Sequence, residues 1–146
     1  DSIKAGLGVV IRTWDGLFCA GLACPYWGNS ALQAEAAAAV KGLQLASQVG
    51  QLGIVMETDS KVLFYGVNDH GCRQAWSILP LLEEIRLLSL NFREVRWSWV
   101  SRNANRAAHK AASIGFGSVE LKSWAFRPPQ SLVHVLVSDG LPCPPS

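Results

Sequence analysis

Long uncharged apolar runs are missing from this sequence of 146 residues. No stretch reaches the roughly 18 apolar residues of a membrane-spanning helix, and no basic segment followed by an apolar one opens the chain. We therefore expect an intracellular protein, in the nucleus or the cytoplasm, that has no membrane partner. Asp1 stands where a methionine would begin a complete chain, which indicates a fragment or a processed product.

Cysteines at metal-binding spacing are also missing. The four cysteines are Cys19, Cys24, Cys72 and Cys143, and none of them has a near neighbour at the short spacing typical of zinc ligands. A chain with this much apolar sequence does not need a disulfide framework to be stable. We expect free, buried thiols.

Charged residues are few, at 16% of the chain against 49% hydrophobic residues. This composition excludes a disordered segment and is typical of a packed globular domain. The net charge of +2 says little about partners unless the basic residues gather on one face. The length suits one domain, and we expect a monomer.

The predicted elements begin with an antiparallel hairpin. Its strands, 7–14 and 17–26, are joined by Asp15-Gly16, a dipeptide typical of tight turns. Further strands are predicted at 53–58 and 95–99, and helices at 31–49, 61–67, 76–90 and 104–114. Adjacent strands followed by strands that alternate with helices predict an α/β fold, a mixed sheet with helices on its faces.

The composition changes after Gly117. Residues 118–146 contain a short apolar helical segment around Leu132 and a Pro-rich end. We predict a domain at 1–117 and a C-terminal tail at 118–146.

Three polar residues fall where the sheet and the helices could bring them together. Glu35 lies on the first long helix, Asp59 follows a predicted buried strand, and His109 lies on the Ala-rich helix. Taken singly, each has an ordinary interpretation: a solvated carboxylate, a helix cap and a surface histidine. Glu35 is surrounded by alanine and leucine, so its side chain could equally face the sheet.

Several motifs in register resemble the type-1 ribonuclease H family, most closely its plant reverse transcriptase-like branch. They are Gly-Leu-Gly-Val-Val-Ile-Arg, Ala-Glu-Ala, Glu-Thr-Asp-Ser, and Trp-Ser-Trp-Val with the following Asn-Arg-Ala-Ala-His, and they span residues 5–112. The resemblance implies a five-stranded mixed sheet with helices on both faces. It also implies four acidic residues that bind two Mg²⁺ or Mn²⁺ ions and cut the RNA strand of an RNA–DNA hybrid.

By this resemblance Glu35, Asp59 and His109 are the catalytic and metal-binding candidates. Glu35 and Asp59 match two of the family's acidic ligands. His109 falls at the fourth acidic position, where an imidazole is a softer ligand that brings no negative charge and suits Mn²⁺ better than Mg²⁺. The family's first aspartate closes a first strand that the few residues before Gly6 cannot form. We therefore expect a sheet largely without its first strand, and impaired catalysis.

The basic residues gather in one part of the sequence. Between positions 93 and 110 there are five basic residues and one acidic residue, an excess of four charges in a chain whose net charge is +2. A nucleic-acid backbone is the natural partner of such a stripe, here an RNA–DNA hybrid or an RNA duplex. The nucleic-acid-binding candidates are Arg96, Arg102, Asn105, Arg106 and Lys110.

Two other interpretations concern nearby residues. The basic stripe could be an ordinary solvated face, and we assign Trp97 and Trp99 to core packing. Three functions therefore compete: a metal-dependent RNA–DNA hybrid ribonuclease, a catalytically degenerate nucleic-acid-binding module, and a protein-interaction domain that uses the apolar segment 129–137.

Overall fold

The hairpin at the start of the chain forms as predicted. In the computed structural model, which describes residues 2–68 and 73–138, β1 (Ile3–Arg12) pairs antiparallel with β2 (Phe18–Gly28). The intervening turn is closed by a hydrogen bond from the backbone N–H of Thr13 to the carbonyl of Leu17, 2.8 Å long. Gly16 adopts a φ of 95° there, a conformation that favours glycine.

The first long helix, α1 (Ala31–Gln48), begins and ends at the predicted signals. The Ser30 side chain caps the N-terminus by accepting a hydrogen bond from the backbone N–H of Gln33. At the other end Gly50 has a φ of 81°, and its N–H donates to the carbonyl of Ser47. The next N–H, of Gln51, donates to Ala46, which completes a Schellman motif.

A parallel pair of strands follows, as the alternation of strands and helices predicts. β3 (Gly53–Thr58) pairs with β4 (Glu94–Trp99). Three helical segments lie between them in the sequence: α2 (Lys61–Asn68), the 3₁₀ helix η1 (Arg73–Ile78) and α3 (Leu79–Ser89). The first residues of the predicted helix 76–90 are therefore 3₁₀, and Pro80 lies in the first turn of α3, where its missing N–H costs nothing.

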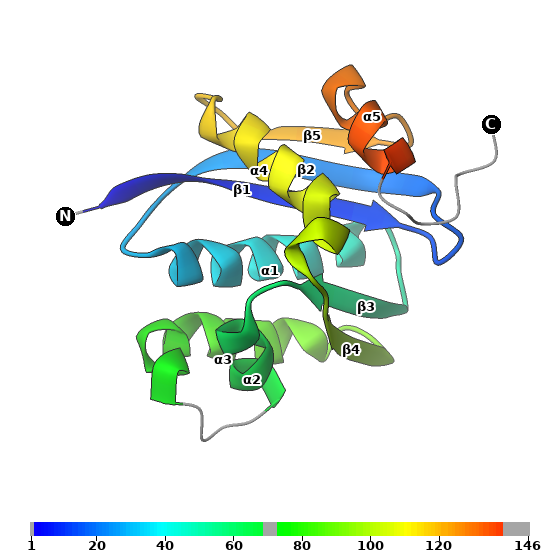
Figure 1. Cartoon of the computed structure of the whole chain (residues 1–146). Helices are drawn as coiled ribbons and strands as arrows, with labels where there is room; N and C mark the ends of the chain where they lie inside the picture. Colours follow the sequence, from blue (N-terminus) through cyan, green and yellow to red (C-terminus); the bar gives the residue numbers. More distant parts are fainter. Residues whose placement is uncertain (1, 69–72, 139–146) are drawn as a thin grey trace.

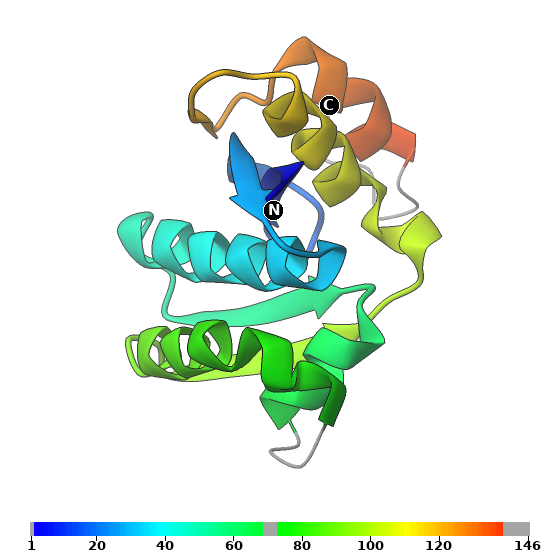
Figure 2. The same cartoon turned by 90° about the vertical axis from the view of Figure 1, so that its left-hand side faces the viewer.

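Helix α1 packs against both groups of strands. One cluster of buried side chains joins its Val40 and Leu43 to the α3 residues Leu82 and Ile85, with Met56 of β3 packed against them. A second cluster joins α1 alanines to the inward residues of the hairpin. Figure 2 shows α1 between the hairpin and β3. This helix therefore holds the two groups of strands together, although they do not share hydrogen bonds.

Helix α4 (Arg106–Phe116) covers the other face of the hairpin (Figure 1), and the 3₁₀ turn η2 (Arg102–Asn105) precedes it. The approach of α4 to β1 requires glycine, because a Cβ at Gly8 would overlap the backbone of α4 at Ala108 and Ala112. Figure 2 shows the hairpin, in blue, between α1, in cyan, and α4, in yellow. Helices on both faces of a mixed α/β arrangement are thus confirmed.

Part of the predicted tail packs against the domain. β5 (Lys122–Ala125) pairs antiparallel with β2, which gives the order β1-β2-β5. α5 (Gln130–Ser138) contains the apolar segment and buries Leu132 and Leu136 against α4. The Pro-rich end lies outside the described residues.

Two remaining expectations concern thiols and membranes. Cys24 is buried and free, and Cys19 is half-buried and free, whereas Cys72 and Cys143 lie outside the described residues. Burial raises the pKa of the Cys24 thiol, and Lys41 opposes that shift. Across residues 2–68 and 73–138, no helix has the length and apolar character needed to cross a membrane.

Candidate functional site

Asp59 and His109 meet at the end of the parallel strands. Asp59 directly follows β3, and His109 lies in the first turns of α4, fifty residues further on. The Nε2 atom of His109 is 2.7 Å from Oδ2 of Asp59, and the side chains are 29% and 13% exposed. The two groups form a hydrogen bond that becomes an ion pair when the imidazole is protonated. Two of the three predicted site residues are therefore in direct contact.

Glu35 lies on α1, half-buried and within electrostatic reach of this pair. Burial raises the pKa of its carboxyl, and the negative charge of Asp59 raises it further. His109 and Arg102 oppose this rise. The side chain of Glu35 thus belongs to the same electrostatic site as Asp59, which favours the sheet-facing interpretation of this residue over the solvated one.

These donors do not fit the two-ion centre that the resemblance implies. Within the part of the chain that the structure describes, no group of three or more His, Cys, Asp or Glu side chains is gathered closely enough to hold a metal ion. One oxygen of Asp59 already contacts His109, whose imidazole is a softer ligand than the carboxylate oxygens that Mg²⁺ prefers. We derive no reaction step through a metal from this donor set.

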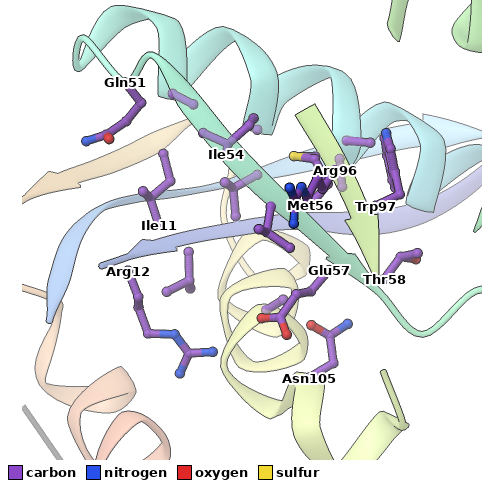
Figure 3. A pocket seen from close by; sticks show the side chains of 18 of the residues that line it. Ile11, Arg12, Gln51, Ile54, Met56, Glu57, Thr58, Arg96, Trp97 and Asn105 are labelled. Carbon is purple, nitrogen blue, oxygen red and sulfur yellow. The ribbon is translucent and has the colours of Figure 1, made fainter. Parts of the chain in front are cut away.

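A cavity lies between β1 and β3. It has a volume of about 910 Å³, and its walls include the free edges of β1 and β3 together with residues of α1 and β4. Figure 3 shows it between these two strands, with Ile11, Met56 and Glu57 on its walls. Among the strands that the structure describes, β1 pairs with β2 and β3 pairs with β4, and no ladder joins β1 to β3. A space between these two strands is what the expected lack of the first strand predicts.

The candidate nucleic-acid-binding residues divide into two groups. Arg102, Arg106 and Lys110 are exposed on η2 and α4, the two segments that lead to and carry His109. Arg106 also makes a long hydrogen bond, 3.4 Å, to the hydroxyl of Ser138 on α5.

Arg96 and Asn105 differ from these three because both line the cavity, as Figure 3 shows. The guanidinium of Arg96 is 2.7 Å from a carboxylate oxygen of Glu94, so part of its charge is already neutralised within β4. The exposed cations Arg102, Arg106 and Lys110 of η2 and α4 lie next to His109 in the sequence.

Trp99 is the feature that sequence reasoning placed wrongly. Trp97 is half-buried and packs against the core as expected, but Trp99 is 43% exposed. Its indole N–H donates to the backbone carbonyl of Asp59 over 3.2 Å, and Lys61 lies over the ring. The alternation of β4 puts both tryptophans on one face, but Trp99 comes at the end of the strand, beside Lys61 of the first turn of α2.

Comparison with known proteins agrees with this architecture. A family model described as reverse transcriptase-like matches residues 1–115. The fold is similar to ribonuclease H1 from the archaeon Halobacterium salinarum, with 21% identity and a TM-score of 0.74 over 80% of this chain and 88% of that one. It is also similar to the N-terminal ribonuclease H domain of a Mycobacterium tuberculosis protein solved as a fusion with maltose-binding protein, with 18% identity and a TM-score of 0.58 over 80% and 93% of the two chains. No curated protein matches the sequence. At these identities the structural likeness concerns the fold alone.

Proposed function

The chain belongs to the reverse transcriptase-like family and has a ribonuclease H-like fold, and we propose that it binds nucleic acid at the Asp59–His109 end of the sheet. The proposed partner is an RNA–DNA hybrid or an RNA duplex. The described residues bring together no group of three or more metal-ligating side chains, and this supports a binding module over a hydrolase. This corresponds to the degenerate alternative that the sequence left open.

The placement of the exposed cations carries this proposal. Arg102, Arg106 and Lys110 lie on the same short stretch that brings His109 to Asp59. A phosphate backbone that crosses this stretch would meet three cations beside a carboxylate that His109 contacts. A-form and hybrid duplexes are bound mainly through phosphates and 2′-hydroxyl groups, which suits a basic surface with little base-reading chemistry.

A second function, metal-dependent cleavage of RNA–DNA hybrids, is supported by the cavity between β1 and β3. A strand in this cavity would pair with both free edges, and an acidic residue at its end would add a third carboxylate beside Glu35 and Asp59. The family resemblance implies such a residue. In this second proposal, hydrolysis requires that additional strand and Mg²⁺ or Mn²⁺.

The test of binding is a salt titration with a fluorescently labelled RNA–DNA hybrid. We expect the double variant Arg102→Ala, Arg106→Ala to bind more weakly and to lose about two units of the slope of log affinity against log salt. The charge-matched control is Lys122→Ala, Arg127→Ala, which removes two exposed cations on and after β5. Equal weakening in both doubles would contradict a localised binding surface, and absence of hybrid binding would reject the proposal.

The test of cleavage uses the same hybrid with Mg²⁺ and with Mn²⁺. We expect the chain alone to bind the hybrid and to cut it feebly or not at all. Brisk cleavage by the chain alone would show that the centre is complete, and the enzyme would replace the binding module as the function.

A further inference from the structure

A lysine and an exposed tryptophan form a pair at the rim of the candidate site. The ammonium group of Lys61, in the first turn of α2, lies 5.2 Å from the centroid of the Trp99 ring. The indole is 43% exposed, although it stands at the end of a strand whose preceding tryptophan is in the core. The exposed part of the indole lies beside an exposed cation and is accessible to a flat ligand.

The indole is held in a fixed position relative to Asp59. Its Nε1–H donates to the backbone carbonyl of Asp59, and the adjacent backbone N–H, of Val100, donates to Thr58 over 2.9 Å. The side chain of Asp59 contacts His109 at the same time. One residue therefore connects the aromatic surface to the carboxylate site, and little freedom of the ring remains to be lost on binding.

We propose that Trp99 and Lys61 form a subsite for one unpaired nucleotide next to the Asp59–His109 pair. The indole stacks on the base, and the ammonium of Lys61 leaves the ring to bind the adjoining phosphate. The exchange is favourable because a phosphate is a stronger partner for an ammonium group than an aromatic ring is. The subsite rests on the proposed function, which it extends.

This subsite selects, among the proposed duplex partners, nucleic acids that have an unpaired base. The faces of bases inside a duplex are covered by their neighbours, so an indole can stack only on a base that is unpaired or terminal. Arg102, Arg106 and Lys110 are suited to the duplex backbone, whereas Trp99 and Lys61 need a single-stranded nucleotide. The favoured partner is therefore a hybrid duplex with a single-stranded extension.

The experiment compares two labelled ligands, a blunt RNA–DNA hybrid and the same hybrid with a short RNA overhang, by fluorescence anisotropy. We expect the overhang to tighten binding about tenfold, within the range that base–aromatic stacking supplies. Trp99→Ala should remove this advantage, so that the blunt hybrid and the overhang hybrid bind the variant equally, and Trp99→Phe should keep part of it. With the overhang hybrid, Lys61→Ala should reduce the slope of log affinity against log salt by about one unit, the loss of one phosphate contact.

Matched controls separate the subsite from general effects. Trp14→Ala removes an indole that is 95% exposed in the turn between β1 and β2, and Lys122→Ala removes an exposed lysine on β5. Both should retain the full advantage of the overhang. If the chain binds the blunt hybrid but gains nothing from either a 5′ or a 3′ overhang, the subsite is wrong while the proposed function stands. If no hybrid binds at all, the proposed function fails and the subsite fails with it.

Discussion

The imidazole of His109 lies 2.7 Å from the carboxylate of Asp59, at the position where the family resemblance implies a fourth acidic ligand. A carboxylate there would repel Asp59 unless a cation lay between them. A histidine instead accepts or donates a hydrogen bond and, when protonated, supplies a positive charge. The substitution therefore lets the two side chains contact each other directly and removes one anionic ligand from the site.

Glu35→Gln should stabilise the fold at neutral pH. Burial and the charge of Asp59 raise the pKa of Glu35 above the ordinary 4.5, so the folded protein holds the proton more tightly than the unfolded chain does. The stability linked to this proton is fully present below the unfolded pKa and is lost as the pH rises through the folded pKa.

At pH 7 the glutamine removes a charge that is costly to bury, and the melting temperature should rise. The gain should shrink as the pH falls through the raised pKa of the folded state and should be absent below 4.5. The measurement is the melting temperature at pH 7 and at a pH below 4.5. The control, Glu84→Gln on the exposed side of α3, should show no pH-dependent gain. A fall in melting temperature at pH 7 for Glu35→Gln would mean that the charged form of Glu35 is stabilised in the fold.

Gly8→Ala should disrupt the contact between β1 and α4. The added methyl group would overlap backbone atoms at Ala108 and Ala112, which cannot rotate away as a side chain can. We expect a loss of about 1–3 kcal/mol in the free energy of unfolding, measured by urea denaturation. Gly53→Ala is the matched control, because its methyl group would meet only the carbonyl of Glu94 at 3.8 Å. Equal effects of the two variants would mean that α4 can move away from β1.

Leu132→Ala tests how far the predicted tail is part of the domain. Leu132 is fully buried in a cluster with Ala107 and Ala111 of α4. If α5 unfolds together with the rest, truncation should cost about 2–5 kcal/mol in a single urea transition. Val133→Ala, on the exposed side of α5, should cost much less. If the main urea transition of Leu132→Ala has the same midpoint as that of the parent, the tail unfolds independently, as the predicted boundary at residue 117 implies.

Local signals in the sequence predicted local structure well. The Ser30 cap, the Gly50 end of α1 and the bounds of β3 follow from side-chain chemistry within a few residues. The pairing of β5 with β2 could not be predicted, since Lys122–Ala125 is short and has no alternating pattern. The segment forms a strand by pairing with the edge of β2.

The candidate site was predictable to a smaller extent. The motifs identified Glu35, Asp59 and His109 as candidates. The contact between Asp59 and His109 could not be predicted, because it joins residues 50 positions apart and depends on how α4 crosses β1. The exposure of Trp99 depends on where β4 ends relative to α2, and a period-two pattern contains no information about that.

His109→Asp should make the stability of the protein depend on Mg²⁺. In the absence of a divalent ion, the new carboxylate would face that of Asp59 at close range, and their repulsion should lower the melting temperature. A bound cation would relieve this repulsion and would gain a second anionic oxygen ligand, so Mg²⁺ should raise the melting temperature of the variant. In the parent, where the imidazole contacts Asp59, we expect a small effect of Mg²⁺ and a larger one of Mn²⁺, which accepts nitrogen ligands more readily.

The measurement is thermal unfolding with and without each metal, for the parent, His109→Asp and the control His134→Asp. His134 is exposed on α5, so its replacement adds the same charge without facing Asp59. An Mg²⁺-dependent rise confined to His109→Asp would identify the loss of the acidic ligand as the reason the parent binds Mg²⁺ poorly. If Mg²⁺ raises the melting temperature of the parent as much as that of the variant, the imidazole does not weaken Mg²⁺ binding. That result would contradict the proposal that the metal centre is incomplete.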